Sequence, residues 1–158
     1  MESVAYFLRI EGVRGESMRA RHKDEIEVLS FSFAERQAVP SYGSHGASSS
    51  RIEMQDFKVV MKTSIASPVL LEACASGRHI KAAVLSVFVQ ENDVLTFTLS
   101  DVIISAFEIG GENGVFPNDV LSLTYSKIQM RYTQRAADGA TEGETVGGWD
   151  LAANKKLA

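Results

Sequence analysis

One stretch, residues 67–80 (SPVLLEACASGRHI), constrains the fold most, because nowhere else does the chain so clearly predict a helix. Ser67 suits an N-cap, since its side-chain oxygen can accept a hydrogen bond from a free N–H of the first turn. Pro68 follows at the first helical position, where its missing N–H costs nothing. Gly77 stands where helices commonly end in the left-handed conformation. We therefore expect one short helix over residues 68–76.

The helix is predicted to bury one apolar stripe, made of Leu70, Leu71, Cys74 and Val69. A lone amphipathic helix in a β-rich chain must lay this stripe on a sheet or plug the end of a barrel. Cys74 is the only cysteine, so no disulfide can form within the chain. Its place in the stripe favours a buried thiol over a reactive one.

The strand-like segments change phase, which indicates strands that serve two sheets. Ile26 and Val28 share one parity, whereas Leu29, Phe31 and Phe33 share the other. Because side-chain direction alternates along a strand, such a flip predicts a bulge or a passage from one sheet to another. A second flip occurs within residues 52–61.

Other strands are indicated by alternating or continuous apolar residues, and residues 80–90 are apolar on both faces, as in a strand covered on both sides. Trp149 and Leu151 predict a short anchored segment near the end. Two Gly-rich stretches, 109–118 and 134–148, are expected to be loops. The strands are expected at residues 4–11, 26–37, 52–61, 80–90, 94–107 and 119–132. The fold class is therefore mainly β, a closed antiparallel β-barrel or two-sheet sandwich of about seven strands with one short helix.

The composition changes most sharply at residues 38–50 (AVPSYGSHGASSS), where Pro, Gly and Ser dominate. A loop this long between strands is uncommon and is usually functional or disordered. We expect a flexible loop here within one domain that spans residues 1–158.

Charge and hydropathy exclude several classes of function. The net charge of −4 argues against a nucleic-acid surface. The basic run at residues 19–23 is followed at once by Asp24, Glu25 and Glu27, so we expect a solvated loop there. No apolar run approaches the roughly 18 residues of a membrane span, so no membrane insertion is expected. The first residues lack the features of a signal peptide, which predicts assembly in the cytoplasm.

The residues that carry chemistry do not gather into a site. His22, His45 and His79 are scattered, and we expect them to be exposed or cap-related. No second ligand pair completes a zinc site, and no nucleophile elbow is present. The residues alone therefore predict a soluble β-barrel with no catalytic, cofactor or metal site.

Taken together, the segments resemble the haemolysin-coregulated protein (Hcp) family of type VI secretion systems. The helix with SP at its start and ACASG inside it, the SDVIIS segment and the terminal GWD occur in the family's order. One departure is the loop at 38–50, which lacks a long glycine run found in some members. The matching segments are AYFLRIEGVRGES at 5–17, EIEVLSFSF at 25–33, residues 54–80, LTFTLSDVIISAF at 95–107, DVLSLTYSKIQMRY at 119–132 and GWDLAANKK at 148–156.

The resemblance implies a homo-hexameric ring whose copies stack into a tube. A contractile sheath fires this tube with its spike out of the bacterium, and the lumen carries and protects effector proteins. The resemblance thus implies secretion without a signal peptide and no enzyme activity. Some relatives carry a toxin domain after the barrel, and we expect none here because the chain ends soon after Trp149.

Two surfaces are assigned to this role. Ser30, Ser32 and Ala34 lie opposite the phenylalanines on their strand and suit a lumen that contacts effectors weakly. Ring stacking is assigned to the loop residues Tyr42, Gly43, Ser44 and His45.

Two other functions stay open. A monomeric small-ligand-binding β-barrel needs an open interior, whereas large residues are expected to fill it: Phe31, Phe33, Phe57, Phe97 and Leu99. A hydrolytic effector would need a catalytic constellation that the sequence does not offer.

Overall fold

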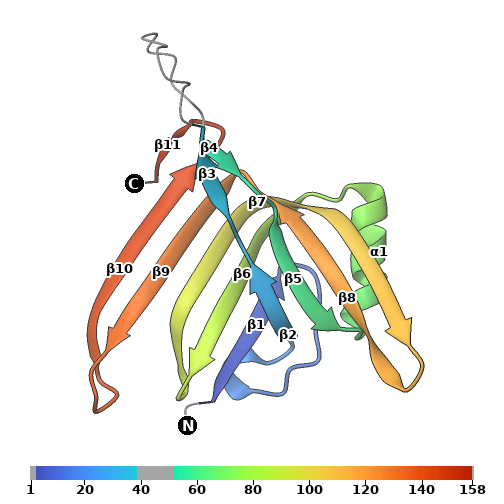
Figure 1. The fold of residues 1–158 in the computed structure, drawn as a ribbon, viewed down its shortest axis with the longest axis horizontal. Helices are drawn as coiled ribbons and strands as arrows, with labels where there is room; N and C mark the ends of the chain where they lie inside the picture. The colour runs from blue at the N-terminus through green and yellow to red at the C-terminus, as the bar shows by residue number, and fades with distance from the viewer. Residues whose placement is uncertain (1–2, 39–51, 158) are drawn as a thin grey trace.

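The computed structural model describes residues 3–38 and 52–157, and its centre is a closed barrel of six antiparallel strands (Figure 1). Their order around the barrel is β7-β6-β1-β2-β5-β8, and pairing between β8 and β7 closes it. The strands are β1 (Val4–Ile10), β2 (Ile26–Ser32), β5 (Phe57–Lys62), β6 (Ile80–Val89), β7 (Asn92–Glu112) and β8 (Val115–Thr124). The predicted fold class is confirmed.

Further elements are attached to this barrel. β9 (Lys127–Arg135), β10 (Thr141–Asp150) and β11 (Lys155–Lys156) extend the sheet outward from β7. β3 (Glu35–Gln37) and β4 (Ile52–Met54) form a separate two-stranded sheet. The helix α1 (Ala66–Ser76) packs against β7, and a 3-10 turn, η1 (Ala20–His22), lies in the loop before β2.

Strand β7 belongs to two parts of the sheet. Its first half pairs with β6 on one side and β9 on the other, whereas residues 103–112 pair with β8. The change falls at Asp101, whose φ of 54° is left-handed. The Ser126 hydroxyl donates to the Asp101 carboxylate at 2.7 Å and fixes this turn of the strand.

The barrel interior is filled by packed aromatic rings, as the sequence predicts. Phe57 stacks on Phe31 with ring centroids 5.9 Å apart, and it meets the edge of Phe97 at 5.3 Å. Phe33 packs against the same two rings, and Leu99 is buried beside them. These rings contact one another across the barrel interior.

Both predicted phase flips are confirmed as breaks in the strands. The register between β2 and β5 shifts between Val28 and Ser30, and the intervening Leu29 points to solvent. This is a β-bulge, which turns the following phenylalanines into the core. The second flip is the gap between the end of β4 at Met54 and the start of β5 at Phe57.

The start of the helix differs from the prediction. Helix α1 begins at Ala66, and Ser64 rather than Ser67 accepts a hydrogen bond from the Ala66 N–H, at 3.2 Å. Ser67 lies inside the first turn, where its hydroxyl donates to the Asp119 carboxylate. The predicted end is confirmed, because Gly77 is left-handed with φ of 64°.

The predicted apolar stripe was wrong at one position. Leu71 is 54% exposed, whereas Ala66, Leu70 and Ala73 are buried at spacings of four and three residues. These spacings keep residues on one helix face, and Leu71 lies off that face. Cys74 is half-buried at its edge.

Two predicted loops are hairpins. Residues 109–118 complete β7 and open β8, with a turn at Gly114, whose φ is 86°. The segment 134–148 joins β9 to β10 in antiparallel pairing. The expected single strand 119–132 is likewise two strands, β8 and β9, that break at residues 125–126.

The basic run at residues 19–23 is more than a solvated loop, because His22 is buried. Its ring stacks on Phe7 with centroids 4.5 Å apart. Its two nitrogens lie 3.0 Å from a Glu25 carboxylate oxygen and 2.7 Å from Asp93. His22 thus ties the loop to the β6–β7 turn. His79 is exposed as expected, and His45 lies outside the described residues.

Replacing Asp119 by alanine is expected to lower the free energy of unfolding by about 1–3 kcal/mol. Asp119 is fully buried and accepts hydrogen bonds from the hydroxyls of Thr63 and Ser67, which would lose their partner. Chemical denaturation measures the change. Glu108→Gln, at an exposed position on the neighbouring strand, is the control. Equal free energies of unfolding for Asp119→Ala and the wild type would show that this link between helix and barrel does not stabilise the fold.

Candidate interaction surface

The structure places Ser30, Ser32 and Ala34 on the outside of the barrel. All three are exposed, whereas Phe31 and Phe33 between them point into the core. The outward direction predicted for these three side chains is therefore confirmed.

The neighbouring strands extend this outward face. Ser32 lies beside Lys58 of β5, Lys58 lies beside Ser122 of β8, and Ser122 lies beside Ala106 of β7. These side chains share one face because directly paired residues in a sheet point the same way. A parallel row consists of Ser30, Val60, Val120 and Glu108. We name this surface, made of the two rows, the serine face.

The serine face was only partly found from the sequence. Lys58 and Ser122 have the outward parity of their strands, so alternation alone gave their direction. Their position beside Ser32 depends on the strand register, which the sequence pattern does not fix. Lys58 is exposed, and the described residues place no carboxylate within ion-pair distance of it.

The corner between β4 and β5 borders this face. The Tyr125 hydroxyl donates to the Gln55 carbonyl at 2.9 Å and holds the break between the two strands. Burial, followed by the negative charges of Asp56 and Glu35, raises the pKa of the Tyr125 phenol. The phenol therefore keeps its proton and this hydrogen bond at neutral pH.

The four residues assigned to ring stacking, Tyr42, Gly43, Ser44 and His45, lie outside the described residues. The two-stranded sheet that leads to them is described. The Arg36 guanidinium and the Glu53 carboxylate form an exposed ion pair across it at 3.0 Å.

One cluster resembles a catalytic triad in composition only. Asp101 accepts from Ser126 at 2.7 Å and lies 3.5 Å from His79. A triad needs the histidine between the other two so that it can take the serine proton. Here the carboxylate stands in the middle, so this serine gains no general base.

In the described part of the chain, no group of three or more His, Cys, Asp or Glu side chains is arranged so that it could hold a metal ion. None of the helices in that part has the length and apolarity that crossing a membrane requires.

These features define a class of protein: a β-barrel with a packed interior, long hairpins beyond it and a polar outer face. The chain belongs to the Hcp family, since residues 7–132 match the family model described as "Type VI secretion system effector, Hcp". The resemblance seen in the sequence is confirmed.

Individual relatives agree with the family match. The chain is 31% identical to Protein hcp1 of Pseudomonas aeruginosa over 158 residues, which cover 96% of this chain and 98% of that protein. The crystal structure of Hcp1 from Salmonella typhimurium is similar, with a TM-score of 0.82, 28% identity and coverage of 98% of this chain and 99% of that one. A structure titled as a type six secretion system protein has the same fold, with a TM-score of 0.91 at 23% identity, and covers 98% of this chain and 100% of its own.

Ser32→Arg is expected to change the free energy of unfolding by no more than about 0.5 kcal/mol, because the side chain is exposed. Phe31→Arg, one residue away, is the matched comparison. It removes a ring that stacks on Phe57, so a loss of about 3 kcal/mol or more is expected. Urea denaturation of both variants gives the two values. A large loss in Ser32→Arg would place this side chain inside the barrel.

Proposed function

We propose that this chain is the subunit of the inner tube of a type VI secretion system. Copies form a hexameric ring, rings stack into a tube, and the tube is exported with effector proteins in its lumen. Family membership supports the role of tube subunit. One combined observation supports the hexamer and its effector-carrying lumen. The barrel interior is packed with aromatic rings, and the serine face continues across neighbouring strands on the outside.

The serine face suits the wall of a lumen. Its small exposed side chains, Ser30 and Ser32, offer hydroxyls to a passing protein. Large apolar residues there would hold effectors too tightly for release, because buried apolar area dominates protein association. In a hexameric ring this face is repeated around the axis and contacts effectors weakly from all sides.

The remaining partners follow from the same role. A contractile sheath surrounds the tube, and a spike precedes it. The subunit assembles in the cytoplasm and leaves through the apparatus without a signal peptide, and its part in secretion is structural rather than catalytic. The proposal includes no resident cofactor or metal.

The packed interior favours this proposal over a monomeric ligand-binding barrel. A small-molecule site in such a barrel occupies the interior. Here Phe31, Phe57 and Phe97 contact one another across that space.

Native mass spectrometry of the purified protein is expected to show a hexamer without bound metal or cofactor. A stable monomer at micromolar concentration would contradict the proposal. Ser32→Arg should keep the hexamer and reduce the amount of effector that co-purifies and is secreted with it. Met18→Arg, at an 82% exposed position in the loop between β1 and β2 and outside the serine face, adds the same charge as a control. Equal effector loss in both variants would show that the serine face does not line the lumen.

The loop at 38–50 is proposed to join one ring to the next. Its glycines and serines make ordering costly, and a neighbouring ring can supply the compensating contacts. Tyr42 is the best anchor, since an aromatic side chain adds contact area at low entropic cost.

Deletion of residues 41–48 should spare the hexamer and its melting temperature while reducing tube formation and secretion together. Tyr42→Ala should reduce both in the same direction by a smaller amount. The measurements are native mass, electron microscopy of tubes and secreted protein. Loss of the hexamer would show that the loop contributes to the contact between subunits within a ring. Unchanged secretion would show that the loop does not join one ring to the next.

A further inference from the structure

Two hairpins extend the sheet beyond the barrel on opposite sides of the molecule (Figure 1). We name them the β9–β10 arm, residues 127–150, and the β7–β8 arm, residues 107–120. In each arm, the face that continues the barrel interior loses the opposing sheet that covers it inside the barrel. As a result, apolar side chains on this face of each arm are exposed.

The β9–β10 arm exposes core-facing side chains. Met130 lies beside Phe97, and Tyr132 lies beside Leu95, so both point to the side on which Phe97 is buried. Nevertheless, Met130 is 47% exposed and Tyr132 is 50% exposed. These two large side chains point to the core side of the sheet, but the described residues leave about half of each uncovered.

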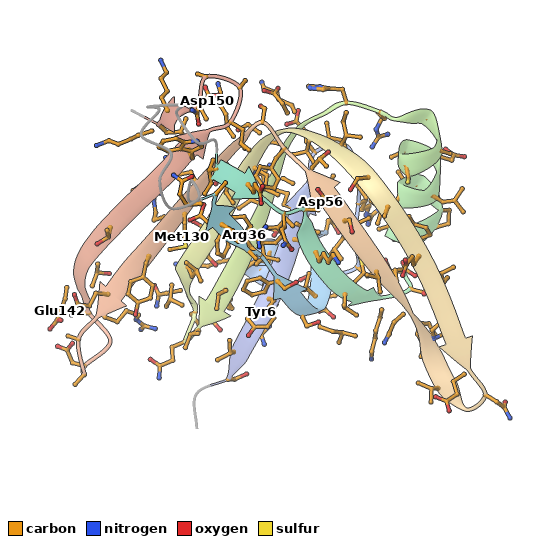
Figure 2. All side chains as sticks on the ribbon, turned by 45° about the horizontal axis from the view of Figure 1, so that its top comes forward. Tyr6, Arg36, Asp56, Met130, Glu142 and Asp150 are labelled. Atoms are coloured by element: carbon orange, nitrogen blue, oxygen red, sulfur yellow. The ribbon has the colours of Figure 1, made fainter. Side chains whose placement is uncertain are left out.

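The same face is hollowed where it meets β3 and β4. A groove of about 570 Å³ lies there, and Met130, labelled in Figure 2, is part of its wall. Gly147 stands beside Met130 on the neighbouring strand, and a Cβ atom added there would meet nothing within 4 Å. Glycine at this strand position therefore has no packing reason within the chain, and it leaves space for an approaching surface. The apolar walls are formed by Phe33, Ile52, Met54, Phe97, Ile128 and Trp149.

The β7–β8 arm exposes a core-facing residue in the same way. Phe107 lies beside Leu121, and Ile109 lies beside Asp119, and both of these partners are fully buried. Ile109 points to their side of the sheet but is 56% exposed. Helix α1 contacts the same strand, β7, and lies on the side of the molecule on which this arm extends (Figure 1).

We propose that these two faces cover each other in neighbouring copies. The β9–β10 arm of one copy lies over the β7–β8 arm of the next, and Met130 and Tyr132 pack against Ile109. This completes between two copies the sheet-on-sheet packing that each arm lacks within its own chain. The inference rests on the ring proposed above.

The occupant is a second copy because the two faces are different and lie on opposite sides. A ring needs such a head-to-tail contact, in which one surface meets another and the rotation closes. An effector or sheath protein would need only one of the faces, and nothing would then require an uncovered core-facing surface on both arms.

Charge placed in either face should break the ring. Met130→Glu and Ile109→Glu are each expected to run as monomers in native mass spectrometry, with a circular dichroism spectrum like that of the wild type. Their melting temperatures should be lower, because the ring contact no longer stabilises the folded state. Val146→Glu is the control for the first arm, because Val146 lies beside Arg131 on the other face of β9–β10. Asn118→Glu is the control for the second, because the exposed Asn118 lies beside Gly110 on the face opposite Ile109. Both controls should keep the wild-type mass.

Mixing the two monomeric variants provides the decisive result. Met130→Glu keeps an intact β7–β8 arm, and Ile109→Glu keeps an intact β9–β10 arm, so together they form one sound contact. The expected product is a dimer with one copy of each variant and no larger species. Tyr132→Glu should behave as Met130→Glu does and replaces it if that variant is unfolded.

The outcomes separate this inference from the proposed function. A wild-type ring that survives Met130→Glu or Ile109→Glu overturns the inference and leaves the tube subunit standing. The same holds if the mixture yields no dimer, or if the control variants also lose the ring. A wild-type monomer overturns both.

Discussion

The structure depends on one strand that serves two parts of a sheet. β7 pairs with β6 as far as Val102 and with β9 as far as Ser100, and from Ile103 onward it pairs with β8. The left-handed backbone at Asp101, fixed by the Ser126 hydroxyl, turns the strand between these partners. This turn allows β8 to close the barrel. It also leaves both ends of the long sheet extending beyond the barrel as arms.

Closure of the barrel decides where function can lie. Phe31, Phe57 and Phe97 contact one another across the interior and take up space that a small ligand would need. Contacts with partners are therefore expected on the outer surfaces, and two of these differ in character. The serine face carries small and charged side chains beside Val60 and Val120, which suits brief contacts. The arms carry uncovered apolar side chains such as Met130, which suit lasting contacts between copies.

The sequence predicts well those features that burial imposes on one chain. The phase flip after Val28 and the outward direction of Ser32 followed from alternation, because one face of each strand is packed. The two arms were predicted only in part: the strand that carries Met130 was expected, whereas residues 109–118 and 134–148 were expected to be loops. Ile109 is more than half exposed in a single chain, so burial does not impose a clean alternation on its end of the strand. Lys58 joined the serine face only when the register was known. The exposure of Leu71 was mispredicted for a related reason. Which helix residues face the core depends on the surface that the helix packs against, and the sequence pattern does not show that surface.

The central claim is that the uncovered core-facing sides of the two arms meet across a head-to-tail contact. A cryo-electron microscopy reconstruction of the purified wild-type protein tests this most directly. The account predicts a six-fold ring in which Met130 and Tyr132 of one copy lie within van der Waals contact of Ile109 in the next. A ring in which these side chains face solvent, or a contact that joins two identical surfaces, would contradict it.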